Sequence, residues 1–478
     1  MPSIDKNSSV PFYRQVYEQI SRGIETGVYS PGKKLPSIRE CARELGVSNT
    51  TIELAYQRLC EEGYVQARRG SGYTICALDE VPANGLERFT DSYRHDLQLL
   101  VQQSREREQD TAPAYDFAYD SVDSTLFPFA AWGRICREVF FTSESKEACL
   151  YNDRQGLKSL RDEMARYLNG EYGLNCIGEQ VIVMPTTRDL VSEIAQLFDP
   201  ATTVVAMGNP GYDEVGRRLR ERGCQLKEIP TFPFPTWDVV EQSLEGVNLV
   251  FATPACQFPT NRPMPLEMRA QLVEWAAEHD AYLIDDEYSW EFQSGETRMP
   301  SLSALDSGGR VITLGTFSNS FTPAVCLSYA VLPPQLMMAW QSRRRGTHPQ
   351  VPWQTQAAMT SFMRDDFWRT HIRKVRTAII RKRRQLIASL KEHLGDNIHC
   401  IEGSCSLFVL VKTNDGRSEE ELIRAAAQAG VRVYPTSQYW QGEPASDWRY
   451  VLVGYASLPI GRIDAGVQAL ARAWFPAM

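Results

Sequence analysis

The feature that most constrains the fold is a series of short apolar segments between residues 181 and 333, separated by stretches with helical patterning. The six segments are VIVMP at 181–185, TVVAMG at 203–208, LVFATP at 249–254, YLIDDE at 282–287, VITLG at 311–315 and LSYAVLP at 327–333. Apolar strands that alternate with helices are typical of a mostly parallel sheet with helices on both faces. The sequence therefore predicts an α/β body.

The rest of the chain is expected to form further units around this body. With 478 residues, 43% of them hydrophobic and 23% charged, the chain is long enough for roughly three domain-sized cores. A basic helix over Arg373–Leu390 precedes apolar strands at 407–411 and 431–435, which predicts a small C-terminal α+β domain. Apolar residues spaced by three or four from Leu86 to Leu100 predict a partly helical linker. We expect four parts: a head at 1–76, the linker at 77–112, a large domain at 113–352 and a small domain at 353–478.

The composition excludes several classes of protein. A net charge of -8 argues against a chain that coats nucleic acid over its whole surface, so a nucleic-acid site must be local. The 11 cysteines include no C-x-x-C pair and the six histidines are scattered, so no metal site is predicted and a reducing compartment is favoured. No apolar stretch approaches the roughly 18 residues of a membrane helix. We therefore expect a cytoplasmic protein without a membrane partner.

The first 76 residues predict three helices and a hairpin. An apolar stripe from Phe12 to Ile24 forms the first helix, and Ser37 and Ser48 can cap the second and third. A tight turn at Gly46 joins the last two helices, as in a helix-turn-helix whose second helix presents its first residues to the major groove. The alternative interpretation is a small helical domain whose polar helix start only faces water.

The run from Pro11 to Ile75, which contains PSIRE, GVSNTTIELAY and ARRGSGYTI, resembles nearly end to end the winged-helix DNA-binding domain of the GntR family of bacterial regulators. The resemblance implies that double-stranded operator DNA is bound by the PSxR segment, the start of the third helix and a glycine-rich wing. It places on that interface Ser37, Arg39, Ser48, Asn49, Thr50, Thr51, Arg68, Gly70, Ser71 and Gly72. Family members often carry Arg where this chain has Asn49, so the operator preference of relatives does not transfer to this chain.

Most of the remaining chain carries a second set of matching phrases. They are Leu126-Phe127-Pro128 with Trp132, YNDRQGLKSLR at 151–161, NPGY at 209–212, TPACQFPT at 253–260, Asp286 with Tyr288, and GTFSNSFTPAVCLSY at 315–329. These phrases resemble the pyridoxal-phosphate-dependent aminotransferases of fold type I, in the version fused behind a GntR-type head in the MocR regulators. The resemblance implies a fold type I body and a homodimer.

The resemblance also implies a cofactor or effector pocket. Its residues would be Thr186, Thr187, Arg188, Tyr212, Asp286, Tyr288, Ser318 and Asn319. In the enzymes an Asp pairs with the pyridine nitrogen, a Tyr bonds the ring hydroxyl and an aromatic residue packs on the ring. Asp286, Tyr288 and Tyr212 stand at those positions, although a strand-end Asp and a half-buried Tyr also fit a purely structural role.

The chain departs from the enzyme pattern at the residues that carry the chemistry. Where the family phrase reads GTFSK, this chain has Asn319, and an amide can neither form a Schiff base nor accept the proton of transamination. The other departures are Cys326 for the phosphate-binding Arg, Pro185-Thr186-Thr187-Arg188-Asp189 for the glycine-rich phosphate loop, Cys256 for a His, Asn261 for a Gly, and Leu452 for the carboxylate-binding Arg. We therefore predict no transaminase activity, and pyridoxal 5'-phosphate held at most without a covalent bond.

Three hypotheses follow for the function. The leading hypothesis is a transcription regulator whose head binds operator DNA and whose body forms a homodimer and senses a small amino-acid-like or pyridoxal-type effector. The second is an active pyridoxal enzyme that uses a lysine from elsewhere in the chain. In the third, the body is a structural platform for dimerisation and binds no ligand.

Overall fold

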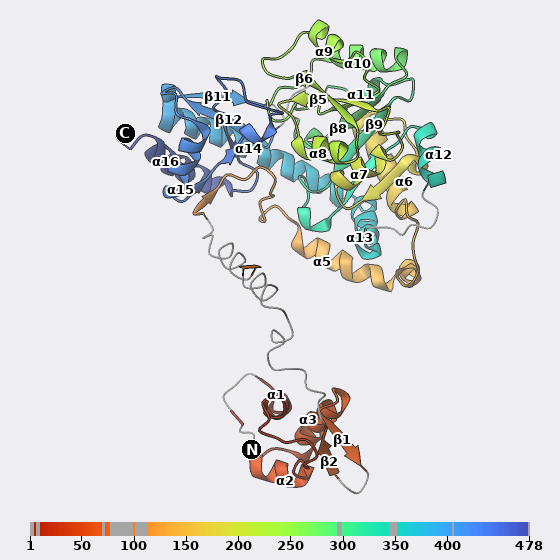
Figure 1. Cartoon of the computed structure of the whole chain (residues 1–478), viewed down its shortest axis with the longest axis vertical. Coiled ribbons are helices and arrows are strands. Elements are labelled where there is room, and N and C mark those ends of the chain that lie inside the picture. The colour runs from red at the N-terminus through yellow and green to blue at the C-terminus, as the bar shows by residue number, and fades with distance from the viewer. Residues whose placement is uncertain are drawn as a thin grey trace. The chain divides into compact units, whose positions relative to one another are not determined.

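The computed structural model describes residues 4–5, 10–68, 72–76, 99–100, 113–293, 299–343, 351–403 and 406–476. Contacts divide the chain into two compact units, Met1–Ala112 and Pro113–Met478, and Figure 1 shows the helices and strands of each. Gly70 and Ser71 of the predicted wing, and nearly all of the predicted linker, lie outside the described residues. No helix within these ranges is long and apolar enough to cross a bilayer.

The head has the predicted order of elements. They are α1 (Phe12–Glu25), α2 (Ile38–Leu45), α3 (Asn49–Glu61), β1 (Val65–Arg68) and β2 (Gly72–Ile75). Both predicted caps are confirmed, because the Ser37 and Ser48 hydroxyls accept from the backbone N–H groups of Glu40 and Thr51, each at 3.2 Å. The turn after α2 needs a left-handed residue, and Gly46 supplies it with a φ of 65°. Side chains from α1, α2, α3 and the antiparallel hairpin share one core.

The large domain of the body is built on a seven-stranded sheet in the order β4-β10-β9-β8-β7-β5-β6. Its strands are β4 (Val181–Met184), β5 (Val204–Asn209), β6 (Gln225–Pro230), β7 (Leu249–Ala252), β8 (Tyr282–Asp286), β9 (Val311–Thr316) and β10 (Ser328–Val331). Every neighbouring pair from β9 to β6 is parallel, while β10 is antiparallel to both β9 and β4. All six predicted segments form strands, and the mostly parallel sheet is confirmed.

Helices cover both faces of this sheet. The helices and short turns of the large domain are α5 (Phe129–Glu138), η2 (Val139–Phe141), η3 (Ser143–Cys149), α6 (Lys158–Tyr172), η4 (Gly178–Gln180), α7 (Thr187–Ala195), α8 (Asp213–Glu221), α9 (Trp237–Ser243), α10 (Leu266–Glu278), η5 (Trp290–Phe292), α11 (Leu302–Leu305), η6 (Pro323–Val325), α12 (Pro334–Arg343) and α13 (Trp353–Arg364). Val205 and Met207 of β5 pack in a core with α7, α8 and α12, whereas Ala206 packs in a core with α9, α10 and α11. This alternation along one strand is what two covered faces require.

The small domain has an antiparallel sheet in the order β11-β12-β15-β14. Its elements are α14 (Phe367–Leu394), η7 (Gly395–Asn397), β11 (Ile398–Glu402), β12 (Phe408–Thr413), α15 (Glu419–Gln428), β13 (Val431–Arg432), β14 (Tyr434–Pro435), η8 (Ser437–Tyr439), β15 (Val451–Gly454) and α16 (Ile460–Trp474). The first strand of the body, β3 (Tyr115–Asp116), pairs in parallel with β13. The start of the body therefore belongs to this domain.

The packing places the transition between the two body domains inside α14. The whole of α13 packs in a core with α5 and α6 of the large domain. Along α14, Ile372 still lies in that core and Val375 lies in the core of the small domain. The boundary expected at residue 353 therefore lies before the change of core. The spacing of apolar residues predicts which face of a helix is buried, but it does not show which domain core that face joins.

Candidate functional site

The head exposes the start of α3 together with one side of α2. Ser48, Asn49 and Thr50 are exposed, and Thr51 is half-buried. The Ser48 and Thr51 hydroxyls also bond each other at 2.8 Å. Asn49 and Thr50 are therefore the exposed residues of the first turn of α3 whose side chains take no part in the cap. Arg39 is exposed in the first turn of α2. The sequence placed these residues on the DNA interface, and the structure holds them on two adjoining helices with a common core.

The wing is described in part. Gly72 starts β2, is exposed, and has a φ of 80°, a conformation that L side chains rarely adopt. The backbone of Arg68 ends β1 opposite Gly72. Lys33 and Lys34, which were not predicted, are exposed and belong to a segment bonded along β2. The sequence feature that could have identified them is the basic pair directly after the Pro31-Gly32 turn. These two lysines add two cations beside the wing.

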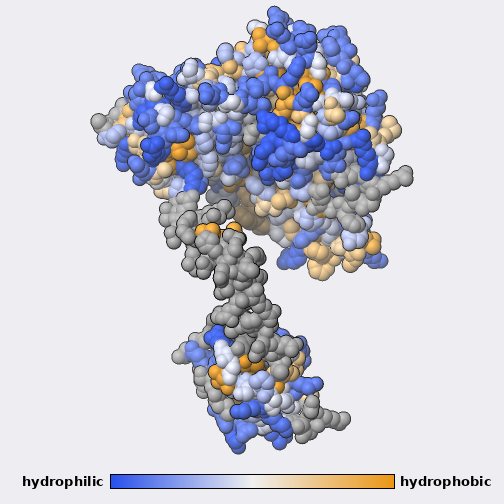
Figure 2. Space-filling model, viewed as in Figure 1, coloured by the Kyte–Doolittle hydropathy of each residue, from blue (hydrophilic) through white to orange (hydrophobic). Residues whose placement is uncertain are grey.

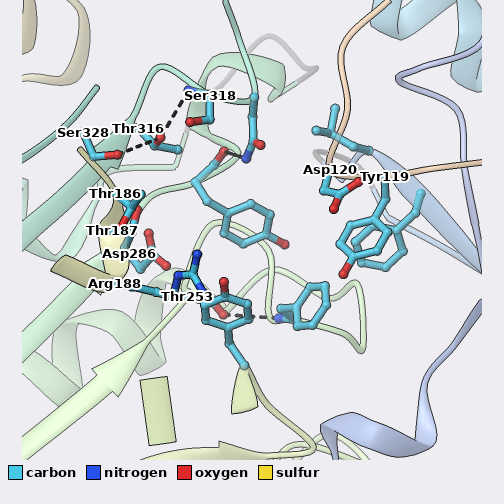
Figure 3. Close-up of a pocket in the computed structure, with 16 residues that line it drawn as sticks. Tyr119, Asp120, Thr186, Thr187, Arg188, Thr253, Asp286, Thr316, Ser318 and Ser328 are labelled. Atoms are coloured by element: carbon cyan, nitrogen blue, oxygen red, sulfur yellow. Dashed lines mark hydrogen bonds between the residues drawn. The ribbon is translucent and has the colours of Figure 1, made fainter. Parts of the chain in front are cut away.

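All eight predicted pocket residues line one cavity of about 290 Å³ in the body. Eight further lining residues were not predicted: Tyr119, Asp120, Thr253, Phe258, Thr316, Ser328, Leu407 and Phe408. Thr187 opens the helix after β4, Asp286 ends β8 and Thr316 ends β9, so the cavity lies where strands of the central sheet end. In Figure 3, Thr186, Thr187, Asp286 and Thr316 lie on one side of the cavity, and Tyr119 and Asp120 lie on the other. This edge is where open α/β sheets bind ligands.

Asp286 is the buried acidic group of the cavity. Its side chain is 5% exposed, and its Oδ1 has no hydrogen-bond partner among the described residues. Burial, with a smaller contribution from the neighbouring Asp285, raises the pKa of Asp286 to about 7. A carboxyl group in this state can accept from an N–H group of a ligand, or donate to a neutral ring nitrogen.

Asn319, at the position of the expected lysine, is bonded to the protein itself. Its Nδ2 donates to the backbone oxygen of Tyr288 at 3.2 Å. The Tyr288 hydroxyl donates in turn to the backbone oxygen of Cys256 at 3.0 Å. A chain of bonds continues from the Cys256 thiol to Asn261 at 3.2 Å, and from Asn261 Nδ2 to the backbone oxygen of Phe408 at 2.8 Å. Three of the departures from the enzyme pattern thus lie in one network that reaches the small domain.

The end of the cavity where the enzymes hold a phosphate is different here. Arg188 is the single cation among the described lining residues, and its Nη1 pairs with Glu214 at 2.8 Å. The Asp189 carboxylate accepts from the backbone N–H of Thr186 at 3.1 Å and from its hydroxyl at 2.6 Å, as a capping box at the start of α7. Cys326 is exposed, Leu452 is fully buried in an apolar cluster, and neither lines the cavity.

Two other polar clusters lie away from the cavity. Lys382 on α14 is 2% exposed and pairs with the buried Asp123 at 2.7 Å. Within the described ranges, one group of three side chains, Glu392, His393 and Asp464, has the spacing of metal ligands. In that group the Asp464 carboxylate already accepts from Ser389 and contacts His393. None of these residues lines the cavity, and no lysine in the described part of the chain does.

Comparisons with known proteins identify both units. Residues 12–75 match the family "Bacterial regulatory proteins, gntR family", and residues 120–448 match "Aminotransferase class I and II". The chain is 32% identical to the HTH-type transcriptional regulator YhdI of Bacillus subtilis, over 99% of this chain and 98% of that one. It is 28% identical to the probable rhizopine catabolism regulatory protein MocR of Rhizobium meliloti, over 98% and 95%. The chain is a MocR-type regulator of the GntR family.

Solved structures agree with the fold of this MocR-type regulator. The α-aminoadipate aminotransferase LysN of Thermus thermophilus, complexed with N-(5'-phosphopyridoxyl)-L-leucine, superposes with a TM-score of 0.68 at 22% identity, over 77% of this chain and 93% of that one. The predicted fold type I body and winged-helix head are confirmed. The protein is a DNA-binding transcription regulator with an aminotransferase-like body, a fold that binds pyridoxal derivatives in its enzymes.

Proposed function

We propose that this MocR-type regulator binds operator DNA in the cytoplasm as a homodimer, and that a small effector in the body cavity changes its DNA affinity without being transaminated. The observation that carries the proposal is the cavity itself. It retains a buried, unbonded carboxyl oxygen on Asp286, yet its described lining contains no amine and Asn319 is bonded to the backbone. Such a cavity can bind a ligand but cannot form the covalent bond of a pyridoxal enzyme.

Pyridoxal 5'-phosphate itself fits this site only in part. Asp286 suits a ring nitrogen, which is where the enzymes draw electrons into the cofactor. The aldehyde would meet Asn319, and the phosphate would meet a single ion-paired Arg188. A pyridoxal-type molecule is therefore held without a covalent bond. Borohydride treatment of the chain with pyridoxal 5'-phosphate is expected to modify no single lysine completely, and a full cofactor-sized increment on one specific lysine would restore the enzyme hypothesis.

The head is the part of the proposal that a gel shift tests directly. Arg39→Ala is expected to weaken binding to the chain's own promoter region and to lower the slope of log affinity against log salt by about one, because one cation near the DNA is lost. Arg22→Ala is the matched control, since Arg22 is also exposed but lies on α1. Unchanged binding by Arg39→Ala would refute this placement of the interface.

The dimer is proposed to form through an apolar surface on the large domain. Between residues 129 and 151, Phe129, Phe140, Phe141, Leu150 and Tyr151 are 67%, 48%, 85%, 66% and 82% exposed. Figure 2 shows hydrophobic colouring around α5 at the lower edge of the body. Exposed apolar groups of this size mark interfaces, and a two-fold dimer would let two heads bind paired half-sites.

The dimer surface is testable by sedimentation velocity on the full chain. Wild type is expected to sediment as a dimer, and Phe141→Glu as a monomer, because the substitution places a charge in the centre of an apolar contact. Val239→Glu is the control, since Val239 is 41% exposed on α9, which lies at the opposite edge of the large domain from α5 in Figure 1. A Phe141→Glu chain that stays dimeric would place the interface elsewhere.

A further inference from the structure

We infer that the body cavity takes a single-ring aromatic ligand that carries a basic nitrogen and no phosphate group, with the nitrogen at Asp286 and the other end of the ring among neutral hydroxyl groups. The inference rests on the proposed function, since it names the ligand class of the same cavity. Four features of the lining carry it: its charge, the start of α7, the hydroxyl groups and the aromatic rings.

The charges of the lining disfavour an anion. Asp120 and Asp286 are acidic, and Arg188 is the single basic residue of the described lining. Arg188 is ion-paired with Glu214, whose other oxygen contacts Arg217. A phosphate dianion in this cavity would lie near one guanidinium, which is ion-paired with Glu214, and near two carboxyl groups. Burial of an anion without its own cation is strongly unfavourable, whereas a protonated nitrogen balances the lining.

The start of α7 shows the same preference. In a helix that binds phosphate, the first backbone N–H groups point at the anion. Here the Asp189 carboxylate takes both the N–H and the hydroxyl of Thr186. A bound phosphate would stand in the same turn as this carboxylate, and the two would repel each other. The Asp189 carboxylate does not itself line the cavity, but it places a negative charge in the first turn of α7, beside the lining residues Thr186, Thr187 and Arg188.

Most of the other polar groups of the lining are neutral hydroxyls. Six of the lining residues are Ser or Thr: Thr186, Thr187, Thr253, Thr316, Ser318 and Ser328. Thr316 Oγ1 accepts from Ser328 Oγ at 3.0 Å and from the backbone N–H of Ser318 at 3.1 Å, as Figure 3 shows. Hydroxyls both donate and accept. They suit a hydroxymethyl or carbonyl group of a ligand, which needs no countercharge.

Aromatic rings surround the remaining space. Tyr212 and Tyr288 each meet Phe258 edge-on, with ring centroids at 6.0 and 6.4 Å, and Tyr119 meets Phe408 at 5.8 Å. Rings in this arrangement leave faces for a flat ligand, and their faces attract a positive charge. The volume of about 290 Å³ is at the small end of ligand cavities, which limits the ligand to one ring with short substituents.

Calorimetric titration of the full chain tests this inference with three probes and two phosphorylated counterparts. The probes are pyridoxine, pyridoxamine and tyramine, compared with pyridoxine 5'-phosphate and pyridoxamine 5'-phosphate, and none of them carries an aldehyde that could label surface lysines. At least one unphosphorylated probe is expected to bind. Pyridoxine or pyridoxamine, where it binds, is expected to do so at least ten-fold more tightly than its own 5'-phosphate. Equal or tighter binding of the phosphates, or no binding by any of the three probes, would overturn the inference.

Two variants and one control assign the binding to the named groups. Asp286→Asn is expected to weaken the best probe ten-fold or more, while Asp238→Asn, at an exposed carboxylate on α9 outside the lining, changes it less than three-fold. Glu214→Gln frees Arg188 and is expected to strengthen a phosphorylated probe without changing its unphosphorylated partner. Unfolding curves of the variants exclude misfolding as the cause. Because these titrations contain no DNA, they can fail while the gel shift with Arg39→Ala succeeds, so the inference and the proposed function are tested separately.

Discussion

Replacing Asp286 with asparagine should change how the stability of the body depends on pH. In the folded protein, burial raises the pKa of this carboxyl group from its ordinary 3.8 to about 7. Between these two values the folded chain binds more protons at this site than the unfolded chain. Its free energy of unfolding therefore falls as the pH rises from about 4 to about 7, and the loss is complete above that range.

The size of the effect follows from the shift. About three pKa units at about 1.4 kcal/mol each give an upper value of about 4 kcal/mol. Asparagine does not ionise, so the variant escapes this penalty. Wild type and Asp286→Asn are expected to have similar stability near pH 4, and the variant is expected to be more stable by up to about 4 kcal/mol at pH 8.

Urea unfolding followed by tryptophan fluorescence measures this difference for the body alone. The chain has 10 tryptophans, and the first in sequence is Trp132, so the head does not contribute to the signal. Asp120→Asn is the matched control, because this carboxylate of the same cavity is exposed and should leave the pH dependence unchanged. The structure shows a buried carboxyl group at Asp286. If the stability of Asp286→Asn follows the wild-type curve from pH 5 to pH 8, that burial is wrong.

Two other substitutions test the body. Lys382→Met leaves the Asp123 charge buried without its partner and should lower the free energy of unfolding by about 3–5 kcal/mol in the same fluorescence assay, whereas adding Asp123→Asn should restore part of the loss. Asn319→Lys restores the amine but not the phosphate cation at Cys326, so amino-acid assays should detect no transamination. Turnover by that single variant would contradict the interpretation of the cavity as a ligand site only.

Much of the architecture was predictable because its determinants are local. The caps at Ser37 and Ser48 and the apolar strands of the central sheet were read directly from the sequence. The strand of the central sheet that was not predicted is β6, QLKEIP, which lies at the edge of the sheet with charged residues exposed. An edge strand needs no continuous apolar run, so its sequence resembles that of a loop.

The cavity was predictable only where a phrase marked it. Thr253 and Phe258 lie in the matched stretch TPACQFPT, so a closer examination of that phrase could have found them. Leu407 and Phe408 come from the small domain and reach the cavity through the packing of two domains distant in sequence. No regular sequence spacing connects these two residues to Asp286. Their place in the lining could therefore be found only from the structure.

Hydrogen bonds link three of the positions at which the resemblance expects other residues. Asn261, where the resemblance expects glycine, has a left-handed φ of 67° and bonds both Cys256 and Phe408. Its amide lies where a Cβ at Gly403 would stand, 2.5 Å from that position, so the small domain accommodates this side chain only with a glycine at 403. Asn319 joins the same network through Tyr288. Cys256 and Asn261 bond each other directly, and Asn319 connects to them only through Tyr288, so these three positions are linked across the two body domains.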